Sequence, residues 1–481
     1  MKKNLIWFRN DLRVHDNTAL YKACTFSTEQ IIALFIATPQ QWYNRNISEK
    51  KISFLNQNLI SLKNELYNLN ILLYYYESTT FKKSVNDLVV FCQQHKINNV
   101  FYNYQYDSDE HVRDVVATKK LSEQGVITHG FHDHILVSSQ DILTQKNMPY
   151  KKFFSFKKKI INILKKKIPI CFPVPKKRAH PLSFHSIDLN IKNYKSNFDL
   201  NLFPIGERKA IIRLKAFLKK KLSDYALKRN FPILNHTSML SPYLSIGVLS
   251  SRYCFKMIFQ IHKNIFNTIS TCSWINEIMW REFYYHLLIG YPLLNQCQSL
   301  TPWEKNIPWK NNTNYFHAWK QGQTGFPIID AGMRQLKKIG WMHNRLRMIT
   351  SSFLVKNLLI DWRKGEKYFI SQLIDGDKAI NNGSWQWAAS IGADSTPYIR
   401  IFNPIRQSKI FDSSGSFIKK FIPELNNVPC AYIHNPYEWA NIKNITLQYP
   451  KPIVNFSDTK KKALLIFNQT RLKYLDKENK N

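Results

Sequence analysis

The hydrophobic pattern of this chain changes once, near residue 200, and that change constrains the fold more than any other feature. Before residue 130, short apolar runs alternate with segments whose apolar residues recur at helical spacing, whereas beyond residue 207 only helical spacing remains. The apolar runs indicate buried strands at Leu5–Phe8, Ile31–Ile36, Ile71–Tyr75 and Val100–Tyr102. This alternation predicts crossover units that build a parallel sheet covered by helices on both faces.

The first glycine of the chain is Gly125. Dinucleotide fingerprints and P-loops need glycines where the backbone must approach a phosphate. We therefore expect a Rossmann-like sheet that does not bind a nucleotide in the usual way.

At 481 residues the chain is longer than one typical domain. We predict an α/β domain at 1–137, a connector at 138–205, an all-helical domain at 206–455 and a Lys-rich tail at 456–481 that forms one more helix. The stretch from Lys146 to Arg178 has twelve basic residues, no acidic residue and four prolines, which favours a solvated surface connector over a nucleic-acid-contacting arm. In the all-helical domain we expect helices at Glu207–Lys228, Ser250–Ile261, Ser273–Ile289, Pro327–Ile339, Asn344–Leu359 and Lys367–Leu373.

The net charge of +36 indicates a polyanionic partner, with nucleic acid before an anionic membrane. Lys, Asn and Ile are all over-used, so a drift in composition that leaves lysines on solvated surfaces is an equal alternative. The seven cysteines are scattered without a C-x-x-C pair, which argues against a metal site and a disulfide framework and fits a reducing compartment. The N-terminus lacks a signal-peptide pattern and no apolar stretch could span a bilayer, so we expect a soluble, cytoplasmic protein without a membrane partner.

Nine of the twelve tryptophans fall between Trp274 and Trp387, among carboxylates, amides and arginines. Tryptophan has a flat apolar ring with one polar N–H, and it is enriched where a ligand or partner is held against a partly wet surface. This region therefore predicts a site for planar, polar, aromatic molecules.

One predicted helix carries charged and aromatic residues on the same stripe, three or four positions apart: Trp274, Glu277, Trp280, Arg281 and Tyr284. An ordinary amphipathic helix would separate the two kinds of residue, although aromatics facing inward beside a surface Glu–Arg pair remain an alternative. Stacking rings beside a carboxylate and a guanidinium are suited to recognising a nucleic-acid base.

Three further segments offer polar groups of the same kind. Asn344 and Arg345 open another helix, where they either bind a ligand or serve as a cap and a surface pair. The turn Asp375–Asp377 makes a weak metal site and a stronger donor–acceptor edge for a heterocycle. Thr237–Ser241 supplies hydroxyls and backbone amides that could cradle a phosphate at a helix start.

The chain resembles the photolyase/cryptochrome flavoproteins, and among them most the bacterial cyclobutane-pyrimidine-dimer photolyases of the class I, folate-antenna type. The resemblance covers Leu5 to about Pro452 and rests on six segments in the order of the family: WFRNDLRVHDN, TSMLSPYLSIG, WINEIMWREFY, TGFPIIDAGMRQL, WMHNRLRM and DGDKAINNGSWQWAASIGADSTPY. It implies a helical domain that binds FAD, reduced in the active form, and a pyrimidine dimer flipped out of UV-damaged DNA. It also implies a folate antenna, 5,10-methenyltetrahydrofolate, and a protein that acts as a monomer.

The resemblance also implies a role for individual residues. FAD would be contacted by Tyr225, Thr237, Ser238, Met239, Leu240, Ser241, Trp274, Asp375, Gly376 and Asp377, and Asn381 would face the flavin N5. Glu277 would hydrogen-bond the carbonyls of the dimer, between stacking walls formed by Trp280 and Trp387. Further contacts to the dimer or the DNA backbone would come from Arg281, Tyr284, Asn344, Arg345 and Gln407. Electrons would reach the flavin from the surface through Trp309, Trp362 and Trp385, the last of which is innermost.

Two positions depart from the family pattern. Met239 stands where the family often has Arg near the FAD phosphates. The folate pocket usually combines an Asn–Glu pair with a Lys, but here the pair is Asp109–Glu110 and the segment Leu293–Gln298 has no Lys. An added carboxylate and a missing ammonium both disfavour a ligand with an acidic tail.

Three other functions compete with dimer repair. A cryptochrome, which senses blue light without repair, would have the same fold. A photolyase for the (6-4) lesion would need a catalytic His that the matching segment lacks, and a basic single-strand-binding protein would bind no flavin. Glu277, Trp280 and Trp387, together with the short tail, favour the repair enzyme.

Overall fold

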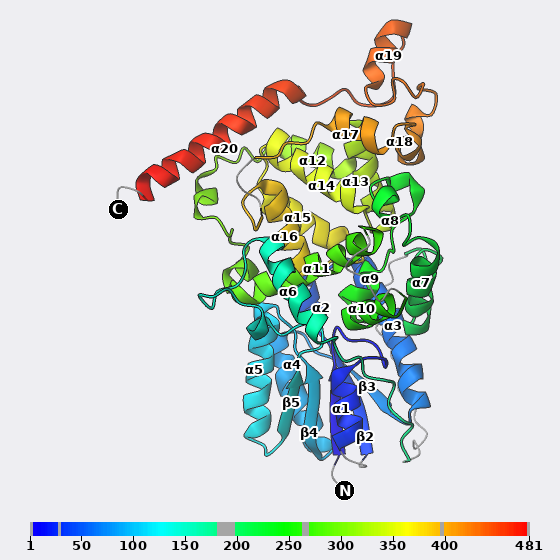
Figure 1. Ribbon diagram of the computed structural model, residues 1–481, viewed down its shortest axis with the longest axis vertical. Helices are drawn as coiled ribbons and strands as arrows, with labels where there is room; N and C mark the ends of the chain where they lie inside the picture. Colours follow the sequence, from blue (N-terminus) through cyan, green and yellow to red (C-terminus); the bar gives the residue numbers. More distant parts are fainter. Residues whose placement is uncertain (1–2, 27–29, 180–197, 262–268, 395–398, 479–481) are drawn as a thin grey trace. The chain divides into compact units, whose positions relative to one another are not determined.

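The computed structural model describes residues 3–26, 30–179, 198–261, 269–394 and 399–478 (Figure 1). Parts of the predicted connector, of the last of the six segments and of the tail lie outside these residues. The chain divides into two compact units, the first formed by 1–223, 238–295 and 374–379 and the second by 224–237, 296–373 and 380–481. The predicted limits at 137, 205 and 455 follow a different division and stay a prediction.

The first unit contains a sheet of five parallel strands in the order β3-β2-β1-β4-β5. The strands are β1 (Lys3–Phe8), β2 (Gln30–Ala37), β3 (Leu72–Glu77), β4 (Ile97–Asn103) and β5 (Ile127–Phe131). The predicted fold class and its four strands are confirmed. The sequence pattern did not indicate β5, because this edge strand is only partly buried and therefore lacks a continuous apolar run.

Helices cover both faces of this sheet (Figure 1). They are α1 (Thr18–Phe26), α2 (Pro39–Asn44), α3 (Glu49–Asn68), α4 (Phe81–Gln94) and α5 (Ser108–Ser122). Alternate strand residues point to opposite faces. Leu5 and Trp7 pack in one cluster with Leu88 of α4, whereas Phe101 meets Phe26 of α1.

The segment 138–205, predicted as a connector without helical periodicity, contains the short turn η1 (Ser139–Asp141) and a helix of fourteen residues, α6 (Phe153–Lys166). The prediction is wrong for α6. Its buried residues are Phe153, Phe156, Ile160 and Leu164. This is a regular helical stripe, and the surrounding lysines and prolines concealed it.

The rest of the first unit is helical. It consists of α7 (Glu207–Lys220), α9 (Ser241–Ser245), α10 (Ser251–Ile261), α11 (Ile269–Gly290) and η3 (Pro292–Gln296). The single helix expected at Glu207–Lys228 is wrong, because α7 ends at Lys220, where the Lys221 backbone leaves helical geometry at φ −125°. A separate turn, α8 (Tyr225–Lys228), follows in the second unit.

The loop after β1, which carries the WFRNDLRVHDN segment, is held by a buried ion-pair network. Arg13 binds Asp133, and Arg252 of α10 binds both Asp16, at 3.0 Å, and Asp133, at 2.6 Å. The two arginines drive the pKa of Asp133 far below its ordinary value against the opposing effect of burial. The charged motif therefore fixes the first unit internally.

In the described residues of the second unit, every regular element is a helix or a helical turn. Its elements are α8, η2 (Pro232–Leu234), η4 (Pro302–Asn306), α12 (Thr313–Gln321), α13 (Pro327–Ile339), α14 (Asn344–Ser352), η5 (Phe353–Asn357), α15 (Trp362–Gln372), most of α16 (Lys378–Ala389), α17 (Pro404–Phe411), α18 (Ser416–Phe421), η6 (Pro423–Leu425), α19 (Pro436–Lys443) and α20 (Phe456–Glu478). The bounds predicted for α13 are confirmed, with Gly340 ending the helix at φ 75°. The helix expected to run to Leu359 changes at Phe353 into one π-helical turn, η5.

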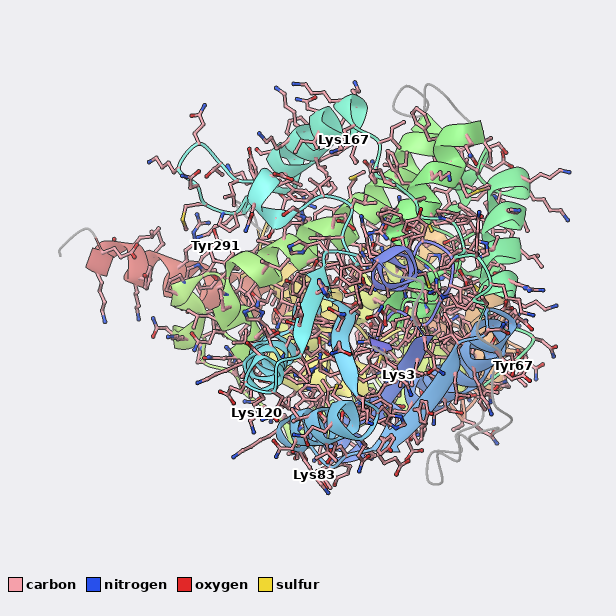
Figure 2. All side chains as sticks on the ribbon, turned by 90° about the horizontal axis from the view of Figure 1, so that it is seen from below. Lys3, Tyr67, Lys83, Lys120, Lys167 and Tyr291 are labelled. Atoms are coloured by element: carbon pink, nitrogen blue, oxygen red, sulfur yellow. The ribbon has the colours of Figure 1, made fainter. Side chains whose placement is uncertain are left out.

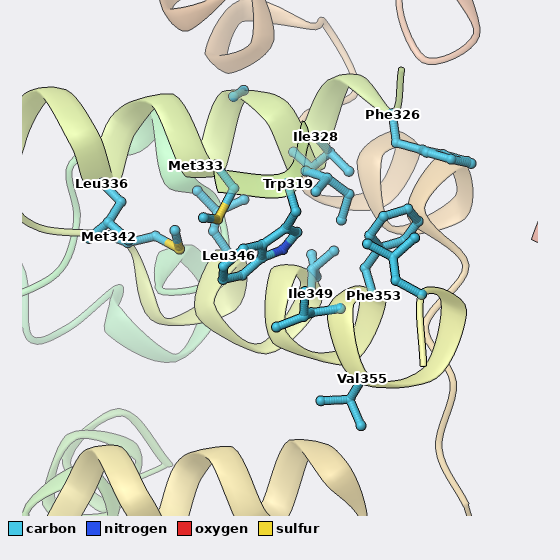
Figure 3. Packing of buried hydrophobic residues seen from close by; sticks show 14 of the residues in the cluster. Trp319, Phe326, Ile328, Met333, Leu336, Met342, Leu346, Ile349, Phe353 and Val355 are labelled. Carbon is cyan, nitrogen blue, oxygen red and sulfur yellow. The ribbon is translucent and has the colours of Figure 1, made fainter. Parts of the chain in front are cut away.

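The core of the second unit surrounds Trp319, whose indole lies between α13 and α14 (Figure 3). Its ring N–H donates to the backbone oxygen of Thr350 at 3.1 Å. The predicted tail helix is confirmed as α20, and its Phe467 is fully buried in the same core. No helix in the described part of the chain is long and apolar enough to cross a membrane.

Candidate active site

Helix α11, in the first unit, carries the five side chains predicted to share one stripe, and the structure divides them by burial. Trp274, Arg281 and Tyr284 are buried, whereas Glu277 and Trp280 remain partly exposed. Residues three apart lie on the same side of a helix. Glu277 and Trp280 therefore form the accessible part of this stripe.

The indole of Trp280 is covered on one face. Phe153 of α6 stacks on it with 3.6 Å between ring centroids and 7° between ring planes. Phe283 and Tyr284 each lie 5.7 Å from it. An indole fixed by three rings and still partly exposed is suited to stacking on a flat partner.

Arg281, predicted to contact the dimer or the DNA backbone, is buried. Its guanidinium is 6% exposed, donates to the backbone oxygen of His134 at 2.9 Å and to Glu282 at 3.1 Å, and lies over the ring of Tyr285 at 4.6 Å. Glu282 is fully buried, and burial raises its pKa to about 7 against the opposing effect of Arg281. These contacts of Arg281 all lie within the first unit, and its contact with the dimer or DNA stays a prediction.

The turn Asp375–Asp377 is fixed by other parts of the first unit. The phenol O–H of Tyr285 donates to Asp377, and the phenol oxygen accepts from the ring Nε2–H of His134 at 2.7 Å. Burial, followed by Asp377, raises the pKa of Tyr285 well above 10, and burial, followed by Arg281, lowers the pKa of His134 well below 6.5. Both groups therefore stay neutral near pH 7.

Lysines hold the same turn. Lys51 of α3 donates to the backbone oxygen of Gly376 at 2.5 Å. Lys378 pairs with Asp107, the N-cap residue of α5, at 3.2 Å. The predicted cofactor turn is thus tied to the elements around the sheet.

The predicted folate pair, Asp109–Glu110, lies beside Arg45, whose guanidinium is 2.8 Å from Asp109, 3.6 Å from Glu110 and 3.1 Å from Asp107. Burial, followed by Asp107, raises the pKa of Glu110. Arg45, which the sequence pattern did not indicate, therefore places a positive charge beside the added carboxylate of Asp109.

The segment predicted to cradle a phosphate contains a strained residue. Met239 is buried and has left-handed backbone geometry at φ 51°, which is uncommon for a side chain other than glycine. Ser238 is partly buried and Ser241 exposed, and both belong with Met239 and the buried Leu240 to the first unit. Strain of this kind is often found at binding sites.

The second unit contains two other residues predicted to contact the cofactor. Tyr225 of α8 is 6% exposed, and the guanidinium of Arg229 lies 5.3 Å from its ring. Thr237 is partly buried. Met239 is far less polar than the arginine that it replaces, so the segment offers hydroxyls and amides without a cation of its own.

Asn381 of α16 is held through its amide nitrogen, which donates to the backbone oxygen of Glu366 at 3.1 Å. The neighbouring Asn382 donates to the Glu366 carboxylate at 2.9 Å and accepts from Gln386 at 2.8 Å. Among the described residues, no hydrogen bond reaches the amide oxygen of Asn381, and the side chain is 8% exposed. Its oxygen can therefore accept from a ligand.

The three tryptophans of the predicted electron path differ in exposure. Trp385 is 2% exposed and packs against Gly365, where a Cβ would lie 2.2 Å from the indole. Trp362 is fully buried and donates its ring N–H to Glu304 at 3.2 Å, whereas Trp309 is partly exposed. Trp362 and Trp385 are thus both buried and Trp309 is accessible, and the direction of the path stays a prediction.

The remaining predicted substrate contacts lie in the second unit. Asn344 is exposed at the start of α14, Gln407 is partly buried on α17 and Trp387 is partly buried on α16. Arg345 donates to Asn230 at 2.7 Å, and its guanidinium lies 4.5 Å from the ring of Phe411. Residues 3–26, 30–179, 198–261, 269–394 and 399–478 contain no group of three or more His, Cys, Asp or Glu that could hold a metal ion.

Residues 4–175 match the family model described as DNA photolyase, and residues 274–469 match the one described as the FAD binding domain of DNA photolyase. A deoxyribodipyrimidine photo-lyase of Buchnera aphidicola subsp. Acyrthosiphon pisum is 58% identical over 98% of this chain and 98% of its own length. The chain belongs to the DNA photolyase family.

Two solved structures of this fold are also similar over nearly the whole chain. A class III photolyase from Agrobacterium tumefaciens has a TM-score of 0.88 at 30% identity and covers 98% of both chains. A cryptochrome from Synechocystis has a TM-score of 0.86 at 28% identity and covers 97% of this chain and 99% of its own. Fold therefore does not separate repair from light sensing.

Sequence reasoning missed several residues that fix the site. Tyr285 and His134 orient Asp377, Arg45 neutralises the acidic pair and Phe153 supports Trp280. Only Tyr285 is adjacent to one of the six segments, directly after Tyr284. The others are distant in sequence from the residues that they contact, so no local signal could have indicated them.

Proposed function

We propose that this chain repairs cyclobutane pyrimidine dimers in UV-damaged DNA with light and reduced FAD, and that it acts as a monomer. The 58% identity with a deoxyribodipyrimidine photo-lyase over nearly the full length of both chains is the observation that carries this proposal. The accessible pair formed by Glu277 and Trp280 supports it, because a carboxylate next to a stacking ring suits a damaged base.

The residues present fit FAD. In the first unit, we propose that Ser238, Leu240, Ser241, Trp274 and the turn Asp375–Asp377 bind it, and in the second unit Tyr225, Thr237 and Asn381. The amide oxygen of Asn381 supports this assignment, since it can accept from the N5–H of a reduced flavin. When bound, reduced FAD supplies on excitation the electron that splits the cyclobutane ring.

The protein residues bind and orient the dimer. Glu277 would hydrogen-bond the carbonyls of the dimer and stabilise charge that develops there. Trp280 in the first unit and Trp387 in the second would each stack on the dimer, and Asn344, Arg345 and Gln407 would contact dimer or backbone. Photolyases are recognised base-flipping enzymes, and flipping costs a few kcal/mol, less for a damaged pair. Stacking worth about 1–3 kcal/mol per base offsets this cost.

We propose a second role for the tryptophans of the second unit. Trp309, Trp362 and Trp385 would carry electrons from the surface to an oxidised flavin and so restore its active form. This path serves activation only, and the repair step itself does not need it.

We also propose a folate antenna held near Asp109 and Glu110. The guanidinium of Arg45 lies beside both carboxylates, so an acidic ligand is repelled less at this position than the sequence indicates. A near-ultraviolet absorption band in the purified protein, beyond that of flavin, would show the antenna directly.

The test of the main proposal is repair by the reduced holoprotein. A thymine-dimer oligonucleotide is mixed with protein whose flavin has been reduced chemically, and undamaged thymines are counted after illumination and in darkness. Light-dependent restoration of thymines supports the proposal. Intact dimers beside fully reduced, bound flavin would show a light sensor of the cryptochrome type instead.

A further inference from the structure

The outward face of α6 combines one exposed aromatic ring with lysines. The ring of Phe154 is 77% exposed, whereas most phenylalanine rings in a folded chain are buried. Lys158 and Lys165 follow at positions i+4 and i+11 and are exposed, so they share the face of Phe154. From Lys151 to Lys167 the chain has eight lysines and no acidic residue.

The inward face of the same helix is firmly packed in the first unit. Phe156 lies 5.2 Å from Phe283 and 5.1 Å from His286, both on α11. Ile160 and Leu164 are at most 1% exposed. The core of this unit therefore fixes α6 in place, and its outward face is presented in a defined orientation.

The ring of Phe154 follows directly after the ring that supports Trp280. Phe153 stacks on Trp280 at 3.6 Å, and Phe154 is its neighbour in the chain. The exposed ring is thus one position along α6 from the residue that packs on Trp280, which is proposed to stack on the flipped dimer. An aromatic ring among lysines is the combination that binds unpaired nucleic-acid strands, because bases stack on the ring and phosphates pair with the lysines.

We propose that the face formed by Phe154, Lys158 and Lys165 is a second DNA-contact surface. Lys158 and Lys165 pair with phosphates, and Phe154 stacks on a base that loses its neighbour when the dimer leaves the duplex. This inference rests on the proposed function, since it needs Trp280 at the dimer. It changes the interpretation of the basic segment from a solvated connector to a DNA-binding element.

Polyanion binding fits this face better than a membrane surface does. A helix lying in a lipid interface needs a continuous apolar face directed outward. In α6 the residues of the apolar stripe, Phe153, Phe156, Ile160 and Leu164, are all buried. On its exposed face, α6 would therefore present only the ring of Phe154 to a lipid surface.

The first experiment compares Phe154→Ala with Tyr43→Ala, a matched variant whose ring is also 77% exposed. Dissociation constants are measured in the dark for a dimer-containing duplex and for an undamaged duplex of the same sequence. Loss of one stacked base predicts at least about fivefold weaker binding of Phe154→Ala to the damaged duplex. Its binding to the undamaged duplex and both constants of Tyr43→Ala stay unchanged.

The second experiment tests the lysines. Each phosphate contact contributes about 0.9 to the slope of log affinity against log salt, so Lys158→Gln/Lys165→Gln lowers that slope by about 2 on both duplexes. Lys82→Gln/Lys83→Gln is the control, because both lysines are exposed at the start of α4. Lys167 follows the end of α6, and Figure 2 shows Lys83 and Lys167 on opposite sides of the view. An equal loss of slope in the control pair would mean that general surface charge acts, and would overturn the proposal.

Two further outcomes separate this inference from the proposed function. Unchanged affinity of Phe154→Ala for damaged DNA overturns the inference, while light-dependent repair by the wild type would still support the function. Loss of binding to vesicles of anionic lipid by Phe154→Ala, with DNA binding intact, would overturn it in favour of a membrane surface. If the wild type shows no preference for damaged DNA, the proposed function fails, and the inference fails with it.

Discussion

Tyr285 donates its phenol O–H to the carboxylate of Asp377, and this bond joins α11 to the turn proposed to hold FAD. The phenol cannot ionise near pH 7, because burial and the carboxylate raise its pKa well above 10. Tyr285 therefore remains a donor, and Asp377 remains the acceptor of a fixed hydrogen bond.

We predict that Tyr285→Phe weakens FAD binding. Removing a donor from a partly buried carboxylate costs up to about 1.5–3 kcal/mol when the bond is to a charged group, and the turn Asp375–Asp377 loses the contact that orients it. The measurement is the dissociation constant of FAD from apoprotein, read by flavin fluorescence. Tyr291→Phe is the control, since its hydroxyl donates to a neutral backbone oxygen, that of Pro149, at 3.2 Å. Equal flavin affinity in both variants would contradict the assigned role.

We predict that Trp385→Phe stops photoreduction of oxidised flavin and leaves repair by pre-reduced protein intact. Phenylalanine fills most of the space against Gly365 but is far harder to oxidise than an indole. Flavin absorbance under blue light with an external reductant measures the first effect, and repair of a dimer oligonucleotide measures the second. The control is Trp303→Phe, which replaces another buried indole of the same core, and its flavin should be photoreduced normally. Loss of repair in pre-reduced Trp385→Phe would give this residue a different function.

We predict that Trp280→Ala weakens binding to dimer-containing DNA by about 1–3 kcal/mol and hardly changes binding to undamaged DNA. The indole is fixed by Phe153 on one face, so its loss removes a preorganised stacking surface. Binding is measured in the dark, with Trp42→Ala as a variant of another partly buried indole in the first unit. Equal losses on both DNAs would show that Trp280 has no stacking role.

The sequence predicted those parts of the fold that have a strong periodic pattern. Four strands and helix α13 follow from apolar runs and from end signals such as Pro327 and Gly340. Helix α6 was missed because eight lysines surround its four buried residues, so its composition resembled that of a linker. Edge strand β5 was missed because none of its residues is fully buried, so the strand lacks a continuous apolar run.

The sequence predicted residues of the candidate site only where they lie in one of the six family segments. Trp280 and Glu277 lie in one segment, and their partial exposure agrees with access to a partner. Arg281 shares that segment, yet it is buried against Glu282, because helical spacing does not show how far a stripe extends into the core. Arg45, His134 and the other supporting residues reach the site through tertiary contacts that no local pattern encodes.

A last prediction concerns stability at low pH. His286 of α11 is 5% exposed, and burial lowers its pKa to about 4. Its ring bonds the backbone of Val137, while its Nε2 is buried and has no hydrogen-bond partner among the residues that the structure describes. A second proton would therefore have to be placed on a buried nitrogen that no acceptor faces.

The direction of the pH effect follows from this difference in pKa. An unfolded histidine takes up a proton near pH 6.5, whereas folded His286 does so only near pH 4, so between these values the unfolded state binds more protons. The free energy of unfolding should be unaffected by this group above pH 6.5 and should fall by up to about 3 kcal/mol as the pH drops to 4. Urea unfolding of wild type and His286→Gln from pH 7.5 to 4 measures this effect, because other titrating groups cancel in the difference. The variant should lose less stability than the wild type in this window, and parallel curves would mean that the pKa of His286 is the same in the folded and the unfolded protein.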